Sequence, residues 1–170
     1  MTQSEEKFPR VFVFDLDYTL WPCWCDTHIT PPVRASKTGD GIIDRYGETM
    51  SFYSDVPGII AELREKNVKL AIASRTHTPD VARSMLSNLR INGRQAIDYF
   101  DVLEIYPDTK IVHFKEIYKA TKIDYKEMIF FDDESRNKEV ERQLGVKFIL
   151  VRNGLTRQLF DKAIIEWRKR

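Results

Sequence analysis

The sequence predicts an α/β fold: a doubly wound, Rossmann-like parallel sheet with helices on both faces. Five short runs are continuously apolar and rich in β-branched and aromatic residues, a pattern typical of strands buried on both faces. Segments with the apolar period of a helix separate most of these runs, which favours a parallel sheet. The predicted strands are VFVF at 11–14, VKLAIAS at 68–74, FDVLEIY at 100–106, MIFF at 128–131 and VKFILV at 146–151.

Apolar spacing, together with residues that start or stop a helix, predicts the intervening helices. Pro57 lies in the opening turn of the first helix, where a missing backbone N–H costs little. Gly145 suits the left-handed position that ends a helix. The predicted helices cover 55–67, 78–89, 109–118, 135–145 and 155–167.

The segment 23–54 interrupts the alternation of strand and helix. It contains Pro31-Pro32 and three glycines, and its stretch GIIDRYGETMSFY predicts a β-hairpin that turns near Gly47. A chain of 170 residues supports one hydrophobic core. We therefore expect a single domain over residues 1–170, with a small hairpin insert over 23–54 after the first strand.

Charge and hydropathy exclude some partners. The 27 basic and 26 acidic residues leave a formal net charge of +1, so no field of one sign indicates nucleic acid or a membrane surface. No apolar run approaches the roughly 18 residues of a membrane-spanning helix, and MTQSEEKFPR lacks the apolar core of a signal peptide. We expect a soluble protein of the cytoplasm, and also of the nucleus, with no nucleic-acid or membrane partner. The oligomeric state is left open.

Polar residues follow directly on several predicted strands. The carboxyl ends of parallel strands meet at one edge of a sheet, so these residues should lie close together. Lys110 begins the helix after the third strand and would reach the same edge. The residues at the strand ends are Asp15, Asp17, Ser74, Arg75, Asp132 and Asp133.

Four carboxylates at one edge would raise one another's pKa unless a cation neutralised them. Mg²⁺ takes oxygen ligands and commonly lies between one or two carboxylates and a phosphate. Asp15 and Asp17 are two positions apart, so in extended chain both face the same side while Leu16 points inward. One acid could attack phosphorus and form an aspartyl-phosphate, and the other could move the proton.

Four stretches resemble, in order, the four motifs of the haloacid dehalogenase superfamily of phosphatases. They are DLDYTLWP, Ser74-Arg75, Lys110 in TKIVHF, and FFDDESRN. The details of these stretches are similar specifically to the eukaryotic magnesium-dependent phosphatase family. They are the first motif followed by a small insert, the triplet SRT, the KxxHF pattern and FFDDExRN. The resemblance covers the chain from about Phe8 to Val151.

The resemblance implies a role for each acid. Asp15 would be the nucleophile and a magnesium ligand. Asp17 would bind the metal through its backbone carbonyl, and its side chain would act as general acid and then as general base. Asp132 would complete the protein ligands, and Asp133 would hold a coordinated water.

The remaining motif residues would contact the substrate. Ser74 would donate a hydrogen bond to the transferring phosphoryl group, and Lys110 would neutralise its charge and that of Asp15. Arg75 and His77 lie beside the site and would touch the substrate.

Several nearby residues admit two interpretations. Asn137 could orient Asp132 or Asp133, or could lie on the surface. Trp21 and Trp24 could pack the loop after the first strand or touch substrate. Cys23 and Cys25 could hold a metal with nearby Asp26 and His28, but reduced, non-ligating thiols are favoured because no second pair of ligands follows.

Phosphatases of this superfamily often carry a cap domain, and the chain leaves little room for one. One predicted helix and one predicted strand fill the segment between Ser74 and Lys110, and 23–54 is too short for a helical bundle. The hairpin would shield the site only partly, so an open site is expected. The resemblance points to phosphotyrosine and to sugar phosphates, including protein-linked or amine-linked ones, without deciding between a small molecule and a phosphoprotein.

Two other functions stay open at this point. A phosphoaspartate receiver module also combines acids, a hydroxyl residue and a lysine on a parallel sheet, but it places its acid pair without a D-x-D spacing. A catalytically silent phosphate-binding relative would have lost residues needed for chemistry, whereas all of them are present here.

Overall fold

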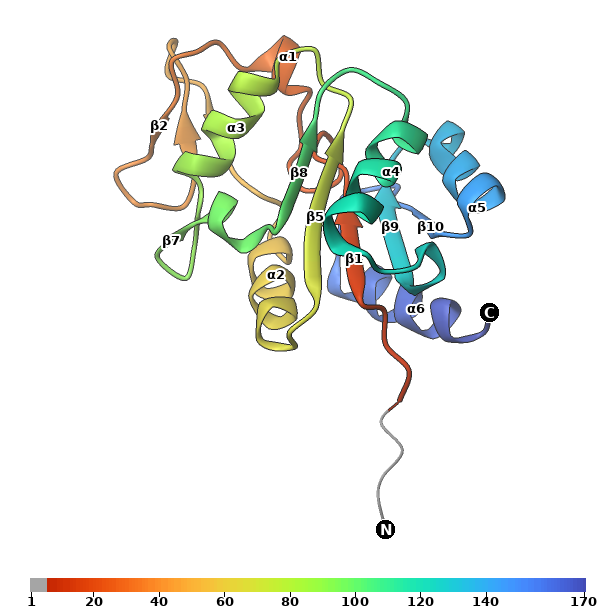
Figure 1. Cartoon of the computed structure of the whole chain (residues 1–170). Coiled ribbons are helices and arrows are strands. Elements are labelled where there is room, and N and C mark those ends of the chain that lie inside the picture. Colours follow the sequence, from red (N-terminus) through yellow and green to blue (C-terminus); the bar gives the residue numbers. More distant parts are fainter. Residues whose placement is uncertain (1–5) are drawn as a thin grey trace.

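Five parallel strands form the central sheet of the computed structural model, which describes residues 6–170 (Figure 1). Each of them overlaps a predicted strand, so the predicted parallel sheet is confirmed. In the order in which they lie side by side, the strands are β10 (Lys147–Leu150), β9 (Met128–Asp132), β1 (Val11–Phe14), β5 (Lys69–Ser74) and β8 (Val102–Ile105).

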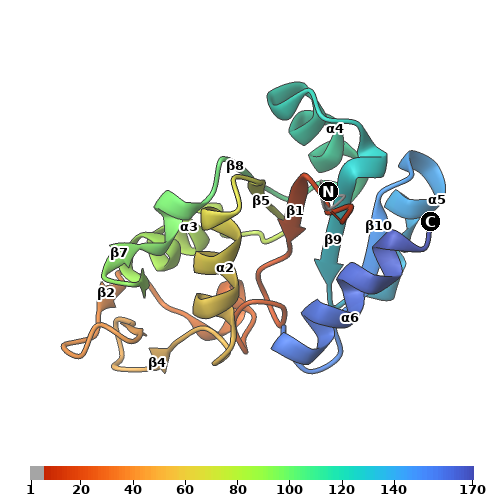
Figure 2. The ribbon, with the colours of Figure 1, turned by 90° about the horizontal axis from the view of Figure 1, so that it is seen from below.

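Helices cover both faces of the sheet, as the continuous apolar runs predict. Alternate side chains of β1 enter two cores: Phe12 and Phe14 pack with α2, α3 and α6, whereas Val11 and Val13 pack with α4 and α5. Figure 2 shows α4 and α5 on one side of the sheet and α2 and α6 on the other. The helices are α2 (Val56–Glu65), α3 (Pro79–Asn88), α4 (Lys110–Thr121), α5 (Glu139–Leu144) and α6 (Arg157–Arg168).

The fourth predicted α-helix is shorter than expected, because its first residues form a 3₁₀ turn instead. A 3₁₀ turn, η3 (Ser135–Lys138), precedes α5, and Gly145 ends α5 with a φ of +88°. The left-handed backbone at this glycine confirms the predicted helix end. None of the helices in the described part of the chain has the length and hydropathy that a bilayer crossing requires.

The direction of the chain reverses at the centre of the sheet. From β1 the chain passes through α2 to β5 and then through α3 to β8, whereas α4 carries it back across the sheet to β9 and α5 leads on to β10. In doubly wound sheets, the crevice at such a reversal opens at the carboxyl ends of the strands and holds the ligand. Here the crevice lies where β1 and β9 end.

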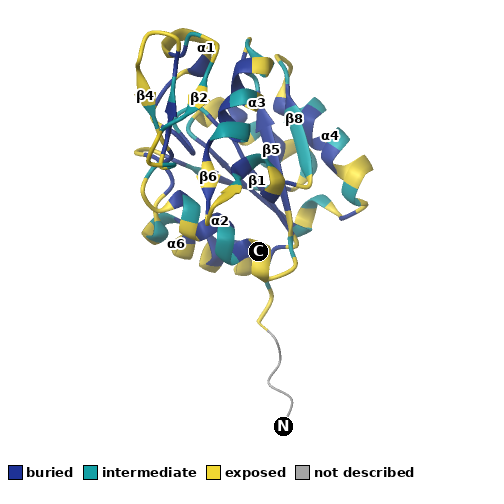
Figure 3. Cartoon of the chain, turned by 90° about the vertical axis from the view of Figure 1, so that its left-hand side faces the viewer, coloured by how far each residue is buried: buried dark blue, intermediate teal, exposed yellow. Residues whose placement is uncertain are grey.

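The insert after β1 is a small antiparallel sheet, so the predicted hairpin is confirmed and extended by one strand. It comprises α1 (Cys25–His28), β2 (Arg34–Ala35), β3 (Ile42–Ile43) and β4 (Thr49–Met50). Gly47, with a φ of +84°, makes the turn between β3 and β4, and the Asp44 carboxylate accepts the backbone N–H groups of Tyr46 and Glu48. Figure 3 shows exposed residues on β4 and buried residues on the central strands.

A second small hairpin, β6 (Arg90–Ile91) and β7 (Arg94–Gln95), was not predicted. The expectation that one helix and one strand fill the segment between Ser74 and Lys110 is therefore wrong. Asn92 and Gly93 both have positive φ, 50° and 76°, as a two-residue hairpin turn requires, and an Asn-Gly pair is a strong signal of that turn. β6 and β7 contact α2 and α3 instead of forming a cap.

Candidate active site

Three carboxylates meet at the carboxyl ends of β1 and β9. Oxygen atoms of Asp15, Asp132 and Asp133 all lie within 4.8 Å of one another. Strand pairing sets this geometry, because the backbone N–H of Asp15 donates to the carbonyl of Phe131 at 3.0 Å, just before Asp132. The structure therefore brings together three of the four acids that the sequence places at this edge.

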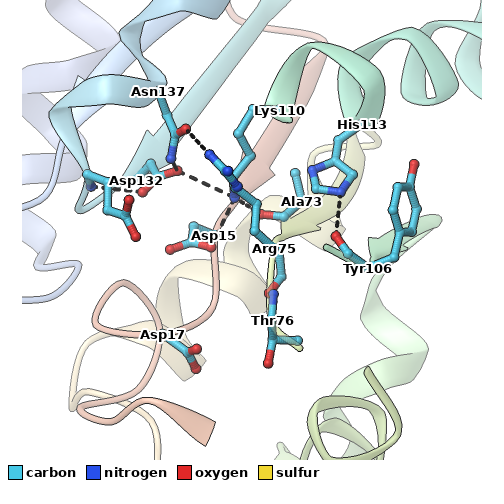
Figure 4. A network of polar contacts seen from close by, with 12 residues as sticks. Asp15, Asp17, Ala73, Arg75, Thr76, Tyr106, Lys110, His113, Asp132 and Asn137 are labelled. Atoms are coloured by element: carbon cyan, nitrogen blue, oxygen red, sulfur yellow. Dashed lines mark hydrogen bonds and ion pairs between the residues drawn. The ribbon is translucent and has the colours of Figure 1, made fainter. Parts of the chain in front are cut away.

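Lys110 joins this cluster from the first turn of α4 (Figure 4). Its Nζ lies 3.1 Å from Asp15 Oδ1 and 3.4 Å from Asp132 Oδ2, and it also donates to the carbonyl of Ala73. The side chain is only 1% exposed. A lysine so deeply buried needs partners of opposite charge, and the two aspartates supply them.

The positive charge of Lys110 does not balance two buried acids, Asp15 and Asp132, together with the half-buried Asp133. Burial raises the pKa of Asp15 to about 7, although Lys110 acts in the opposite direction. Burial likewise raises the pKa of Asp132 and of Asp133 to about 6. Three converging carboxylates with raised pKa values are a set of hard oxygen donors short of positive charge, which fits a divalent cation such as Mg²⁺.

Asn137 fixes the orientation of Asp132. Its Nδ2 donates to Asp132 Oδ2 at 2.7 Å, while the backbone N–H of Glu134 donates to Asp132 Oδ1 at 2.9 Å. Asn137 is itself buried, and its Oδ1 accepts from Arg75 at 3.5 Å. Of the two interpretations of Asn137, the structure shows the one in which it orients Asp132.

Asp17 lies apart from the other three acids and is held by the loop that follows it (Figure 4). Its Oδ1 accepts the indole N–H of Trp21 at 2.8 Å and the backbone N–H of Cys25 at 3.1 Å, and the Cys25 thiol lies 3.8 Å from Oδ2. Burial raises the pKa of Asp17 despite these donors. Trp21 is fully buried, so it packs the loop instead of meeting substrate.

A pocket of about 170 Å³ opens over this arrangement. Asp132, which is fully buried, does not line it. From the insert, Trp24 and Asp26 reach the pocket, whereas β2–β4 do not. The sequence-predicted residues that line the pocket are Asp15, Asp17, Ser74, Arg75, His77, Lys110, Asp133 and Asn137.

Sequence reasoning missed four residues of this pocket. Thr76, Glu134 and Arg136 belong to the stretches SRT and FFDDESRN, yet only the fold shows that they line the pocket. Asp26 follows Cys25 at the start of α1. The sequence indicates Asp26 only as a neighbour of Cys25 in a possible metal site, not as a residue of this pocket.

The cysteines and His113 pack around the site. The Cys25 Sγ lies 3.3 Å from Thr76 Oγ1, and burial raises the pKa of this thiol to about 12, so it is neutral. His113 is fully buried on α4, and its Nε2 lies 3.0 Å from the carbonyl of Tyr106. Its surroundings make His113 a structural residue.

The sequence matches a known family over nearly its whole length. The profile of the acid phosphatase family matches residues 7–170. The human magnesium-dependent phosphatase 1 is 39% identical over 164 residues, which cover 96% of this chain and 89% of the human one. The chain belongs to the magnesium-dependent phosphatase 1 family of haloacid dehalogenase-like hydrolases. Membership of this family makes it a magnesium-dependent phosphatase, and the cluster of three aspartates is where its residues fit the metal.

Other relatives agree with this assignment. A haloacid dehalogenase-like hydrolase of Schizosaccharomyces pombe is 51% identical over 148 residues, covering 84% of this chain and 86% of its own. A Mg-complexed phosphatase domain from Bacteroides fragilis has a TM-score of 0.62 at 16% identity and covers 95% of this chain and 39% of that one. A hydrolase of the same superfamily from Ehrlichia chaffeensis also has a TM-score of 0.62, at 17% identity, and covers 95% of this phosphatase and 98% of its own chain. These two structures support the fold.

Proposed function

We propose that this phosphatase hydrolyses phosphate monoesters through an aspartyl-phosphate formed on Asp15. The observation that carries the proposal is the position of Asp15. Its carboxylate lines the pocket, contacts the buried Lys110, and shares the pocket with Asp17 and Asp133. A carboxylate oriented by a lysine beside a possible proton donor has the parts that nucleophilic phosphoryl transfer needs.

In the first step, a carboxylate oxygen of Asp15 attacks phosphorus and the bond from phosphorus to the leaving oxygen breaks. Asp17 gives its proton to that oxygen. Burial raises the pKa of Asp17, which favours the protonated form that a general acid needs. Trp21 and Cys25 hold its side chain in the pocket wall and so limit its possible orientations.

In the second step, a water molecule attacks the phosphorus of the aspartyl-phosphate. Asp17, now a carboxylate, takes the proton of that water, and inorganic phosphate leaves while Asp15 is restored. Ser74, Arg75 and Lys110 supply hydrogen bonds and positive charge to the phosphoryl oxygens in both steps. Mg²⁺ would be held by Asp15, Asp132 and the backbone carbonyl of Asp17, with Asp133 holding a coordinated water, and would supply further positive charge to the phosphoryl group.

The substrates are phosphorylated small molecules or phosphoproteins, with phosphotyrosine and sugar phosphates as the two classes. The narrow polar pocket suits a phosphoryl group, and the strands of the insert do not line it. A bulky group attached to the phosphate can therefore remain outside. This opening is compatible with both substrate classes.

Asp15→Asn tests the mechanism. An amide cannot form the acyl phosphate, so we expect no measurable release of p-nitrophenol from p-nitrophenyl phosphate with Mg²⁺, whereas the wild-type protein turns over only with the metal. Asp98→Asn, at an exposed position, is the matched control and should keep wild-type activity. Beryllium fluoride should attach to Asp15 as a mimic of the phosphorylated side chain, and an adduct elsewhere would relocate the nucleophile.

A further inference from the structure

A second pocket adjoins the catalytic pocket. It has a volume of about 540 Å³, and Trp24 and Asp133 line both pockets. The catalytic pocket, at about 170 Å³, has room for a phosphoryl group and little else. The group that leaves the phosphate must therefore lie outside it, and the shared wall makes the second pocket a direct continuation.

Trp24 forms an aromatic wall between the two pockets. Its ring is stacked on His28 with centroids 5.7 Å apart and meets Tyr18 edge-on at 5.2 Å. Its backbone N–H also donates to Nδ1 of His28 at 3.0 Å. Although three contacts hold it in place, Trp24 is 52% exposed. A large aromatic side chain that is both exposed and held in place suits a flat ligand.

Tyr18 also lines the second pocket, and its backbone is strained. Its φ is 57°, in the left-handed region that costs a residue with a side chain roughly 1–2 kcal/mol. The turn is closed by the Tyr18 N–H donating to the carbonyl of Trp21 at 2.8 Å. Backbone strain that the surroundings maintain is frequent at ligand sites.

Arg152 supplies the positive charge of the second pocket. It follows β10 at the carboxyl edge of the sheet, where the N–H of Val151 donates to the carbonyl of Asp132 at 2.9 Å. Arg152 is exposed and forms no ion pair or hydrogen bond with the residues 6–170 that the structure describes. The acid that shares its pocket, Asp133, belongs to the carboxylate cluster. Leu150 and Val151 complete an apolar wall beside it.

We propose that the second pocket is the leaving-group subsite, in which Trp24 receives an aromatic ring and Arg152 pairs with a carboxylate on that leaving group. The inference rests on the proposed function, because it needs a phosphate ester bound at Asp15. The substrate class is then an aryl phosphate whose ring carries an acidic arm. A phosphotyrosine beside an acidic group meets this description, and a neutral sugar phosphate does not.

Two synthetic esters isolate the role of Arg152. One is 3-(4-phosphonooxyphenyl)propanoate and the other is its primary amide, so the phenol that leaves is nearly the same and the two differ by one charge. For the wild-type protein with Mg²⁺, we expect kcat/KM to be about three- to fivefold higher for the acid, as for an exposed ion pair. Arg152→Ala should raise KM for the acid, so that the ratio of kcat/KM for the acid to kcat/KM for the amide falls to about one. Arg152→Lys should keep most of the preference for the acid.

Arg94→Ala is the matched control, since Arg94 is exposed on β7 and lines neither pocket. It should leave the ratio of the two esters unchanged. Trp24→Ala should raise KM for both aryl esters about tenfold relative to glucose 6-phosphate, a loss in the range of an aromatic contact, whereas Trp24→Phe should keep the aryl preference. Circular dichroism of each variant checks that it is folded.

The possible results separate the two proposals. If folded wild-type protein with Mg²⁺ hydrolyses neither ester, the proposed function fails, and the subsite fails with it. If both esters are hydrolysed but their ratio is one, or does not change in Arg152→Ala, the subsite is wrong and the proposed function stands. An unchanged aryl preference in Trp24→Ala would likewise overturn the role of the indole.

Discussion

At the scale of single residues, neighbouring groups fix the orientation of the Asp132 carboxylate. It is fully buried, and both of its oxygens accept hydrogen bonds, one from Asn137 and one from the backbone of Glu134. Lys110 lies on the Oδ2 side at 3.4 Å. Replacing a group that orients a metal ligand in this way typically lowers metal affinity or activity by about 10- to 100-fold.

Asn137→Ala is therefore expected to weaken magnesium binding. The Mg²⁺ concentration for half-maximal activity should rise by about 10- to 100-fold, because Asp132 loses the donor that sets its orientation. The measurement is a magnesium titration of p-nitrophenyl phosphate hydrolysis. Asn88→Ala, which removes an amide that donates to the Ser84 carbonyl on α3, far from the carboxylate cluster in the chain, should leave the titration unchanged. An unaltered magnesium requirement in Asn137→Ala would contradict this role.

His113 should make the stability of the protein depend on pH. Burial, with Lys110 nearby, lowers the pKa of His113 to about 4, below the value of 6.5 for an exposed ring. Between pH 6.5 and 4 the unfolded chain takes up a proton that the folded ring does not, so the contribution of His113 to the free energy of unfolding falls as pH falls through this window.

The His113→Gln variant isolates this contribution. Its amide can replace the ring in the contact with the Tyr106 carbonyl but does not titrate. Urea unfolding of metal-free protein at pH 7 and pH 5 gives the change in the free energy of unfolding between the two pH values. This change should favour the folded state more at pH 5 in His113→Gln than in the wild-type protein, and equal changes in both proteins would show that the imidazole does not contribute.

At the scale of elements, the ends of strands and helices place the chemistry. β1 and β9 deliver the acids, α4 delivers Lys110 in its first turn, and η3 delivers Asn137. The return of the chain after α5 depends on a tight helix end at Gly145, from which β10 leads to Arg152. Backbone conformation at this position is therefore part of what shapes the second pocket.

Two glycine substitutions separate backbone strain from side-chain crowding. A Cβ at Gly145 or at Gly58 would meet nothing within 4 Å, but only Gly145 has a positive φ, +88°. We expect Gly145→Ala to lower the free energy of unfolding by roughly 1–2 kcal/mol. Gly58→Ala, in the first turn of α2, should raise it by roughly 0.5 kcal/mol. Urea denaturation measures both, and equal effects would refute the conformational explanation.

At the scale of the whole molecule, the carboxyl edge of the sheet gathers more negative charge than the nearby basic side chains neutralise. The raised pKa values of about 7 for Asp15 and about 6 for Asp132 and Asp133 have one consequence for stability. Without metal, the folded protein keeps protons that the unfolded chain has released above pH 4. Its free energy of unfolding therefore falls as pH rises from about 4 to about 7 through these groups.

Magnesium should reverse this trend. It binds the ionised carboxylates and competes with protons, so its stabilising effect grows as pH rises. We expect the increase in Tm on adding Mg²⁺ to be larger at pH 7.5 than at pH 5.5, by differential scanning fluorimetry. Potassium chloride at the same ionic strength is the control. An equal increase at both pH values would indicate that the metal binds elsewhere.

Local patterns were enough to predict much of the fold. The central strands had a clear signal because they are buried on both faces and so are continuously apolar. Gly47 and Gly145 carried clear turn signals. The Asn92-Gly93 hairpin and the strand β2 were not predicted, although the first has a strong local signal. Strands of two residues offer almost no periodicity, even though their pairing partners lie nearby in the chain, as in Ile91 with Arg94 and Ala35 with Ile42.

The sequence alone determined which chemical groups the protein has and the order in which they follow the strands, because residue type and spacing are local properties of the chain. Only the tertiary structure decided that Asp132 is buried behind Asp15 and Asp133, that Asn137 holds it, and that Trp21 is enclosed while Trp24 faces the pocket. Such distinctions depend on contacts between segments far apart in the sequence. A residue's neighbours in space, and hence its exposure and charge state, are set only when the sheet assembles.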